Sequence, residues 1–192
     1  FPEGLIKERD SNGFPSKVNC FAFYQETADY ININLQSPNQ SLSTRTVDFW
    51  YRFTGGIITS GGDNVMYGDG SSWQGLDIVD DNNGSTAQLR WHTAAGSNPG
   101  ALKTTGLKVN TWYHVAFAAD GTGWELYHNG VSQGTNSTTS TQGSSVRLGT
   151  RGDGTYPYSG LIAAFKMYDR RLSADEIKHN YRVDSERFNV QN

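Results

Sequence analysis

The chain has 192 residues and a formal net charge of −3, and only 18% of its residues are charged. It lacks the basic face of nucleic-acid-binding proteins, a lysine-rich patch for membrane surfaces, and any apolar stretch long enough for a transmembrane helix. We therefore expect neither nucleic-acid binding nor membrane insertion. The 22 Gly, 5 Trp, 10 Tyr and 9 Phe predict many short strands joined by turns.

A chain of this length is expected to form a single domain. Cys20 is the single cysteine, so an intrachain disulfide is excluded and a small buried hydrophobe is expected there. The chain starts at Phe1 rather than Met and without a hydrophobic leader, which predicts a processed or excised piece. Residues 1–17 show no clear period and predict a linker or edge segment. The expected domain covers 18–182, and 183–192 form a C-terminal tail.

The first half of the chain carries strand signals separated by turns. Tyr30–Asn34 alternates large and polar residues, and Thr46–Phe53 places Val47, Phe49, Tyr51 and Phe53 on one face. Residues 61–75 are rich in Gly, Asp and Ser and predict a long loop. Leu76–Val79 and Gln88–Thr93 predict a hairpin, because Asn-Gly lies between them.

The second half predicts further hairpins and then a helix. Trp112–Ala118 and Trp124–His128 are expected strands, and Val146–Gly149 and Gly160–Tyr168 close the sheet. Between them, Gln133–Ser145 is nearly all small and polar, so it predicts a mobile loop or a polar edge strand.

A short helix is predicted over Ala174–Tyr181. Ser173 is its N-cap and Glu176, three residues later, completes a capping box. Many hairpins followed by one helix predict an all-β, antiparallel β-sandwich (jelly roll) with one short C-terminal helix.

The stretch Asn110–Gly121, followed by Glu125–Gly130, resembles the central hairpin of laminin-G-like jelly-roll domains of the concanavalin A-like lectin/glucanase type. That family carries Trp-x-His-Val-Ala, then Asp-Gly, then Leu-Tyr-x-Asn-Gly, as this chain does. Further segments that fit the family in order are Val47–Arg52, Leu148–Gly149, Ser159–Ile162 and Tyr168–Ile177. One departure is the pair Ala163 and Ala164, where the family usually carries two acidic residues.

The same hairpin has a physical interpretation of its own. Val115 and Phe117 are expected to face the core, while His114 faces the other way as a structural hydrogen-bonding group. Asp-Gly and Asn-Gly are expected to supply positive φ at the two turns. Trp50 and Trp112 are expected to be framework residues.

We expect no enzymatic activity. A retaining glucanase of this broad fold needs two glutamates in one cleft, in the pattern Glu-x-Asp-x-x-Glu on one strand. None of the six glutamates lies close enough to another in sequence to build that pattern. The acidic run Asp77, Asp80 and Asp81 is expected to solvate a hairpin turn.

The resemblance also implies a calcium site. Laminin-G-like domains often hold calcium at a rim, and the corresponding residues here are Asp69 and Asp153. The alternative is that both aspartates only form turns, since each precedes a glycine.

Sugar binding is the leading functional hypothesis, because pyranose rings stack on aromatic faces while polar side chains bind their hydroxyls. The alternative is that the aromatic residues only anchor long loops. The residues predicted to bind a ligand are Tyr67, Trp73, Trp91, Arg151, Tyr156 and Tyr158.

Three functions remain open at this point. The first is a non-catalytic carbohydrate-binding or cell-surface-recognition module on a virion surface or in another extracellular setting, with a glycan or polysaccharide as partner; the virion setting rests on similarity of the C-terminal stretch to laminin-G-like domains of viral structural proteins. The second is a structural domain that contacts other structural protein chains. The third is an appended module of a polysaccharide-degrading enzyme.

Overall fold

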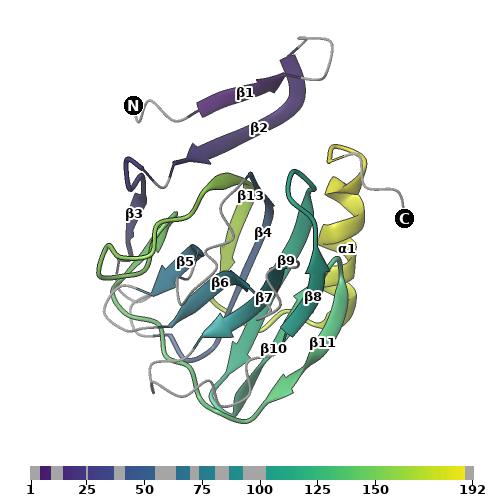
Figure 1. Ribbon diagram of the computed structural model, residues 1–192. Coiled ribbons are helices and arrows are strands. Elements are labelled where there is room, and N and C mark those ends of the chain that lie inside the picture. Colours follow the sequence, from purple (N-terminus) through teal and green to yellow (C-terminus); the bar gives the residue numbers. More distant parts are fainter. Residues whose placement is uncertain are drawn as a thin grey trace.

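A computed structural model describes residues 5–9, 15–24, 26–36, 42–54, 64–69, 74–80, 87–92 and 103–188. In these ranges the chain forms two antiparallel sheets and one helix (Figure 1). The predicted antiparallel β-sandwich with a C-terminal helix is confirmed, in a form that fits a jelly roll. The described part of the chain contains no helix suited by length and apolarity to spanning a lipid bilayer.

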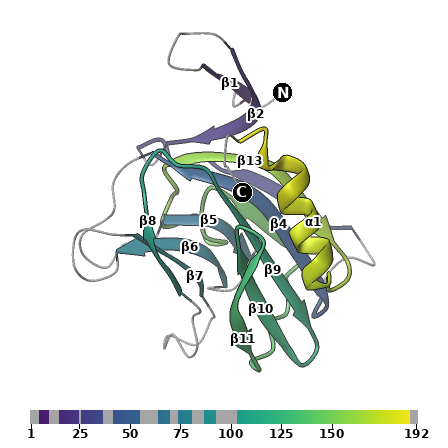
Figure 2. The same cartoon turned by 90° about the vertical axis from the view of Figure 1, so that its right-hand side faces the viewer.

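The first sheet has seven strands, and its order shows that the chain crosses between sheets repeatedly. Its strands, in spatial order, are β1 (Leu5–Arg9), β2 (Pro15–Phe23), β13 (Gly160–Tyr168), β4 (Arg45–Phe53), β9 (Tyr113–Asp120), β10 (Gly123–His128) and β11 (Val131–Asn136). Only Cys20 to Phe23 of β2 pair with β13, so β1 and the start of β2 form a ribbon that projects beyond the sandwich in both views (Figures 1 and 2).

The second sheet has six strands and packs against the first. Its strands, in spatial order, are β3 (Ile31–Asn34), β12 (Ser145–Leu148), β5 (Asn64–Asp69), β6 (Gly75–Asp80), β7 (Ala87–His92) and β8 (Lys103–Leu107). The hairpin expected around residue 83 is present as β6 and β7, although its turn lies outside the described residues.

The core lies between the two sheets. Val47, Phe49, Tyr51 and Phe53 of β4 all enter it, as their alternation predicts. From the facing sheet, Trp91 stacks on Phe117 of β9 with ring centroids 3.5 Å apart, and both side chains are buried. Burial of such large apolar surfaces is the main favourable contribution to folding.

The helix α1 (Ala174–Ser185) lies along β4 and β9 on the side away from β5–β7 (Figure 2). Ser173 caps it, and the predicted capping box with Glu176 is present. Beyond the helix, Phe188 stacks on Trp50 with centroids 4.3 Å apart. The helix ends at Ser185 rather than at the expected Tyr181, and Phe188, in the expected tail, packs on the sheet.

The loop expected over residues 61–75 is interrupted by strand β5. All six residues of β5 are buried, because the core covers one face of the strand and the segment after β12 covers part of the other. The residues of β5 do not alternate between polar and apolar, and the stretch around them is rich in Gly, Asp and Ser, so the sequence predicts a loop there. Of the two alternatives for Gln133–Ser145, the first part is a polar edge strand, β11, and residues 137–144 form no strand.

The two tight turns around β10 differ from each other. Asn129 and Gly130 have positive φ, as expected for Asn-Gly. Gly121 does not, so the prediction for the Asp-Gly turn is wrong. Asp120 instead accepts hydrogen bonds from the backbone N–H groups of Thr122 and Gly123, and these stabilise the turn without a left-handed residue.

Candidate functional site

Three of the predicted sugar-binding aromatic residues are part of the core. Tyr67, Trp91 and Tyr158 are each at most 1% exposed. Tyr67 packs on Trp91, and Tyr158 packs on Phe23. None of the three offers a face to a ligand, because each points between the sheets. Trp73 lies outside the described residues, so its role stays a prediction.

Arg151 and Tyr156 lie on a compact loop between β12 and β13. The loop closes at its base, where Gly149 and Tyr158 pair through their backbones. Within it, Arg151 forms a two-pronged ion pair with Asp153 and stacks over the ring of Tyr156, 4.5 Å from the centroid. Hydrogen bonds from Arg151, together with those from Thr155, outweigh desolvation and hold the pKa of Asp153 well below its usual range.

The same loop packs directly on β5. A Cβ added at Gly68 would lie 2.5 Å from the carbonyl oxygen of Thr150, so only glycine allows the two backbones to approach this closely. Asp69, the next residue of the strand, points into the sandwich instead, because successive side chains of a strand alternate.

The two predicted calcium ligands are therefore not brought together. Asp69 lies 3.8 Å from the guanidinium of Arg45 and accepts a hydrogen bond from the backbone of Gly143, and Asp153 is paired with Arg151. The described residues contain no group of three or more His, Cys, Asp or Glu side chains that could hold a metal. Calcium binding through these aspartates stays a prediction.

Next to this loop, β3 and β12 present a polar surface that sequence analysis does not identify. Arg147 of β12 stacks on the ring of Tyr30, with its guanidinium carbon 4.9 Å from the centroid. Asn32 pairs with Arg147 across the sheet, and its amide donates a hydrogen bond to Asn34. Tyr30 is 52% exposed. We call this surface the β3–β12 face, formed by Tyr30, Asn32, Asn34, Arg147, Arg151, Asp153 and Tyr156.

The loop and the strands of the β3–β12 face touch at Gly154. A Cβ added there would lie 3.2 Å from a terminal nitrogen of Arg147, so the loop passes next to that guanidinium. The alternation in Tyr30–Asn34 and in Val146–Leu148 indicated which side chains point outward. It did not indicate that the two segments are neighbours, since pairing between distant strands has no local signal.

The Asp77–Arg90 pair lies on the outer side of β6 and β7. Asp77 is buried and accepts hydrogen bonds from two nitrogens of Arg90, at 2.8–3.0 Å. The expectation that Asp77 solvates a turn is wrong, because it lies on a strand and pairs with the adjacent strand. The side chains of Asp80 and Asp81 lie outside the description.

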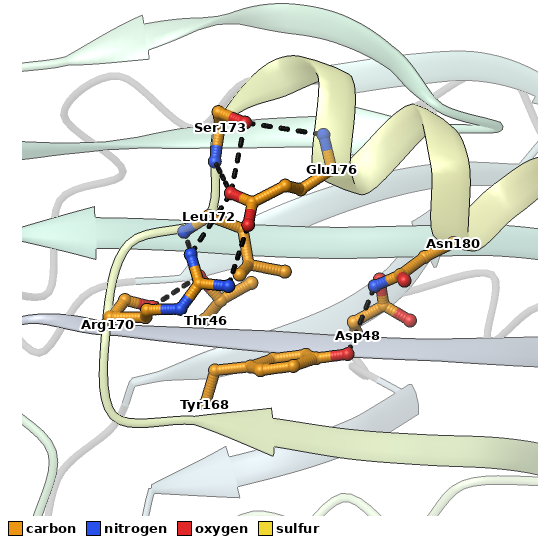
Figure 3. Close-up of polar contacts among 8 residues, drawn as sticks. All are labelled: Thr46, Asp48, Tyr168, Arg170, Leu172, Ser173, Glu176 and Asn180. Atoms are coloured by element: carbon orange, nitrogen blue, oxygen red, sulfur yellow. Dashed lines mark hydrogen bonds and ion pairs between the residues drawn. The ribbon is translucent and has the colours of Figure 1, made fainter.

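A pocket of about 330 Å³ next to α1 is lined in part by Tyr168, Arg170 and Asn180. Several of its polar groups attach the helix (Figure 3). Asn180 donates hydrogen bonds to Asp48 and to the Tyr168 hydroxyl, and Glu176 binds both Ser173 and Arg170. We assign this cluster a structural role.

His114 also has a structural role beneath α1. Its Nε2 lies 3.3 Å from the Asp48 carboxylate, an acid contributed by β4 and therefore not visible near His114 in the sequence. Both side chains are fully buried beneath α1 and the aromatic rings of Trp50 and Tyr181. A buried His–Asp pair without access for a substrate does not form a hydrolytic site.

Comparisons with known proteins agree with this fold. The sequence model of the concanavalin A-like lectin/glucanases superfamily matches residues 25–178. No curated protein sequence matches the chain. Among solved structures, a putative carbohydrate binding protein from Bacteroides ovatus is 19% identical with a TM-score of 0.65, and the match covers 86% of this chain and 48% of that one.

Two further structures were determined with a sugar. The ligand binding domain of botulinum neurotoxin serotype D, in complex with N-acetylneuraminic acid, has 16% identity and a TM-score of 0.56 over 81% of this chain and 40% of that one. Domain 4 of an extracellular arabinanase from Geobacillus stearothermophilus, in complex with arabinotriose, has 20% identity and a TM-score of 0.51 over 72% and 66%. At these identities the likeness shows the fold alone, and the chain spans about half the length of the first structures that it matches.

Proposed function

Because the chain belongs to the concanavalin A-like lectin/glucanase superfamily, we propose that it is a non-catalytic carbohydrate-binding domain. Its setting in this proposal is extracellular, on a virion or another surface, with a glycan or polysaccharide as partner.

The observation that carries the proposal is the β3–β12 face. It combines an exposed aromatic ring, Tyr30, with the Arg147 guanidinium and the Asn32 amide on one side of the sheet. An aromatic platform beside a few fixed polar groups suits a pyranose, which has apolar C–H faces and a rim of hydroxyls. Tyr156, which is partly exposed and contacts the buried Arg151, extends the surface along the adjoining loop.

The similar structures support this proposal. Two of them contain bound sugars, N-acetylneuraminic acid and arabinotriose, and a third is described as a putative carbohydrate binding protein. The arabinanase domain also favours a second candidate function, an appended module that brings a polysaccharide-degrading enzyme to its substrate. Both functions need the same sugar site and differ in what the domain is attached to.

The absence of catalysis is part of the proposal. Glu125 is bound by Ser132 and Arg171, and Glu176 by Ser173 and Arg170. Each of these two carboxylates is thus engaged in structural contacts. We expect no release of reducing sugar from any polysaccharide that the domain binds.

Binding to a glycan array tests the proposal, with Tyr30→Ala as the variant. Loss of the stacking platform is expected to weaken binding by about three- to tenfold, the value of one aromatic contact. Tyr24→Ala is the matched control, because Tyr24 is 51% exposed and Tyr30 is 52% exposed. The control is expected to bind like the unmodified domain.

The array is repeated with calcium and with a chelator, and with Trp73→Ala. Calcium-dependent binding would show that a metal contributes to the site, and an effect of Trp73→Ala would add its loop to the site. If the domain binds no glycan and forms a stable oligomer, the carbohydrate proposal is rejected in favour of contact with other structural protein chains.

A further inference from the structure

We propose that the β3–β12 face recognises an acidic sugar, with Arg147 binding the carboxylate of a uronic or sialic acid residue. This inference rests on the proposed carbohydrate-binding function and names the class of glycan.

The first argument is the ion pairing of the arginines. Among the side chains that the structure describes, these arginines lie within 4 Å of a carboxylate: Arg45, Arg90, Arg151, Arg170, Arg171 and Arg187. Arg147 has no carboxylate within that distance among the side chains that the structure describes, and its neighbour is the Tyr30 ring. Its positive charge is therefore available for an anion from outside the chain, in a protein whose net charge is negative.

The second argument is the space around Arg147. Its partners across the sheet are Asn32 on one side and Gly68 on the other, so a short side chain and no side chain flank it. Gly154, with φ of +86°, brings the loop next to the guanidinium without a side chain of its own. The guanidinium therefore has the backbone at Gly154 and the ring of Tyr30 as neighbours, with no bulky side chain on the adjacent strands.

The third argument is the geometry of the contact itself. The guanidinium carbon of Arg147 lies over the Tyr30 ring, 4.9 Å from its centroid, and a planar guanidinium presents its N–H groups along its edge. An edge of this kind matches the two oxygens of a carboxylate and forms paired charge-assisted hydrogen bonds. Contact with the ring also fixes the side chain, which reduces the entropy lost on binding.

Asp153, the acidic residue of the adjoining loop, is neutralised by Arg151. Asp29, which precedes Tyr30, accepts a hydrogen bond from the backbone N–H of Tyr24. Asn32 keeps its amide oxygen available for a sugar hydroxyl, since it uses a nitrogen to bind Asn34. The face thus offers one unopposed cation, one exposed aromatic ring and one amide.

Matched pairs of glycans test the inference. Oligomers of galacturonic acid are compared with oligomers of galactose, which differ only in the carboxylate, and sialyllactose is compared with lactose. We expect the acidic member of at least one pair to bind about ten- to hundredfold more tightly, the effect of charge-assisted hydrogen bonds. We also expect this preference to decrease as salt is raised.

Arg147→Gln is expected to abolish the preference while leaving weak binding of the neutral glycan. Arg147→Lys, which keeps the charge without the planar edge, is expected to keep part of it. Lys178→Gln, a loss of the same charge on the exposed side of α1, is the control and should change nothing.

Each other outcome has a defined meaning. Equal binding of acidic and neutral glycans, or a preference that survives Arg147→Gln, rejects the role of Arg147 but leaves the carbohydrate-binding function intact. Preference for sulfated over carboxylated glycans rejects the carboxylate specificity. If no glycan binds, the proposed function and this inference both fail.

Discussion

At the scale of single residues, the most unusual feature is the buried Arg45–Asp69 pair. The Arg45 guanidinium donates hydrogen bonds to the Ser140 carbonyl and hydroxyl oxygens and lies over the ring of Phe117. Asp69 accepts a hydrogen bond from the backbone of Gly143. The two side chains thus hold the segment after β11 against the end of the sandwich, so a residue considered for calcium binding has a structural function here.

Removing one member of this pair leaves a buried charge without its partner. Asp69→Ala is expected to lower the free energy of unfolding by about 3–5 kcal/mol, measured by urea denaturation. Arg170→Gln removes an exposed ion pair with Glu176 and is expected to lower the free energy of unfolding much less, because solvent screens exposed charges. Equal effects of the two substitutions would contradict the structural role assigned to Asp69.

At the scale of elements, α1 is attached to the seven-stranded sheet by apolar packing of Ile177 and Tyr181 and by a set of polar contacts. Lys166 of β13 lies between Asp48 and Asp184, at 3.6 Å and 3.0 Å, and Asn180 binds Asp48 from the helix. The helix is only 12 residues long, a length at which an isolated helix is marginal in water. Its cap and these contacts therefore decide whether it stays folded.

Ser173→Ala removes the oxygen that caps the backbone N–H of Glu176. We expect the free energy of unfolding to decrease by about 1 kcal/mol, and thermal denaturation followed by circular dichroism measures the change. Ser144→Ala, at an exposed serine outside the helix, serves as the control and should leave the melting temperature unchanged. No difference between the two variants would show that the capping box contributes nothing.

The elements also show how much of the fold and of the candidate site can be predicted from the sequence. Strands β4 and β9 were predictable because only their core-facing sides are uniformly apolar, and α1 because its cap is a local motif. Strand β5 was not, since its sequence has no alternation of polar and apolar residues and lies within a stretch rich in Gly, Asp and Ser. The candidate site could be predicted only in part. Tyr156 is partly exposed next to the buried Arg151, but the contact of Tyr30 with Arg147 depends on β3 pairing with β12, which no local pattern encodes.

At the scale of the whole molecule, buried ionisable groups couple the stability of the sandwich to pH. Burial, with a smaller effect of His114, lowers the pKa of His128 from 6.5 to about 4. Burial alone would raise the pKa of Asp48, but His114, Asn180 and Lys166 together hold it below its usual value. Asp48 therefore stabilises the fold above the ordinary aspartate pKa, and this contribution is lost as the pH falls through its lower folded value.

His128 gives the clearest prediction. Between pH 6.5 and about 4 the unfolded chain binds a proton at this residue and the folded chain does not, so the free energy of unfolding decreases as the pH falls. The shift corresponds to about 3 kcal/mol over this window. Denaturation at several pH values should show the slope, which His128→Gln should reduce. His179→Gln, at an exposed position on α1, should keep it.

The stacking of Phe188 on Trp50 gives the molecule an intrinsic optical reporter. The indole lies between the sheet, Phe188 and the ring of Tyr181, and it is fully buried. Detachment of α1 would expose this indole to water and shift its emission to longer wavelength. Local release of the helix could thus be distinguished from unfolding of the sandwich, in which Trp91 and Trp124 of the core would be exposed as well.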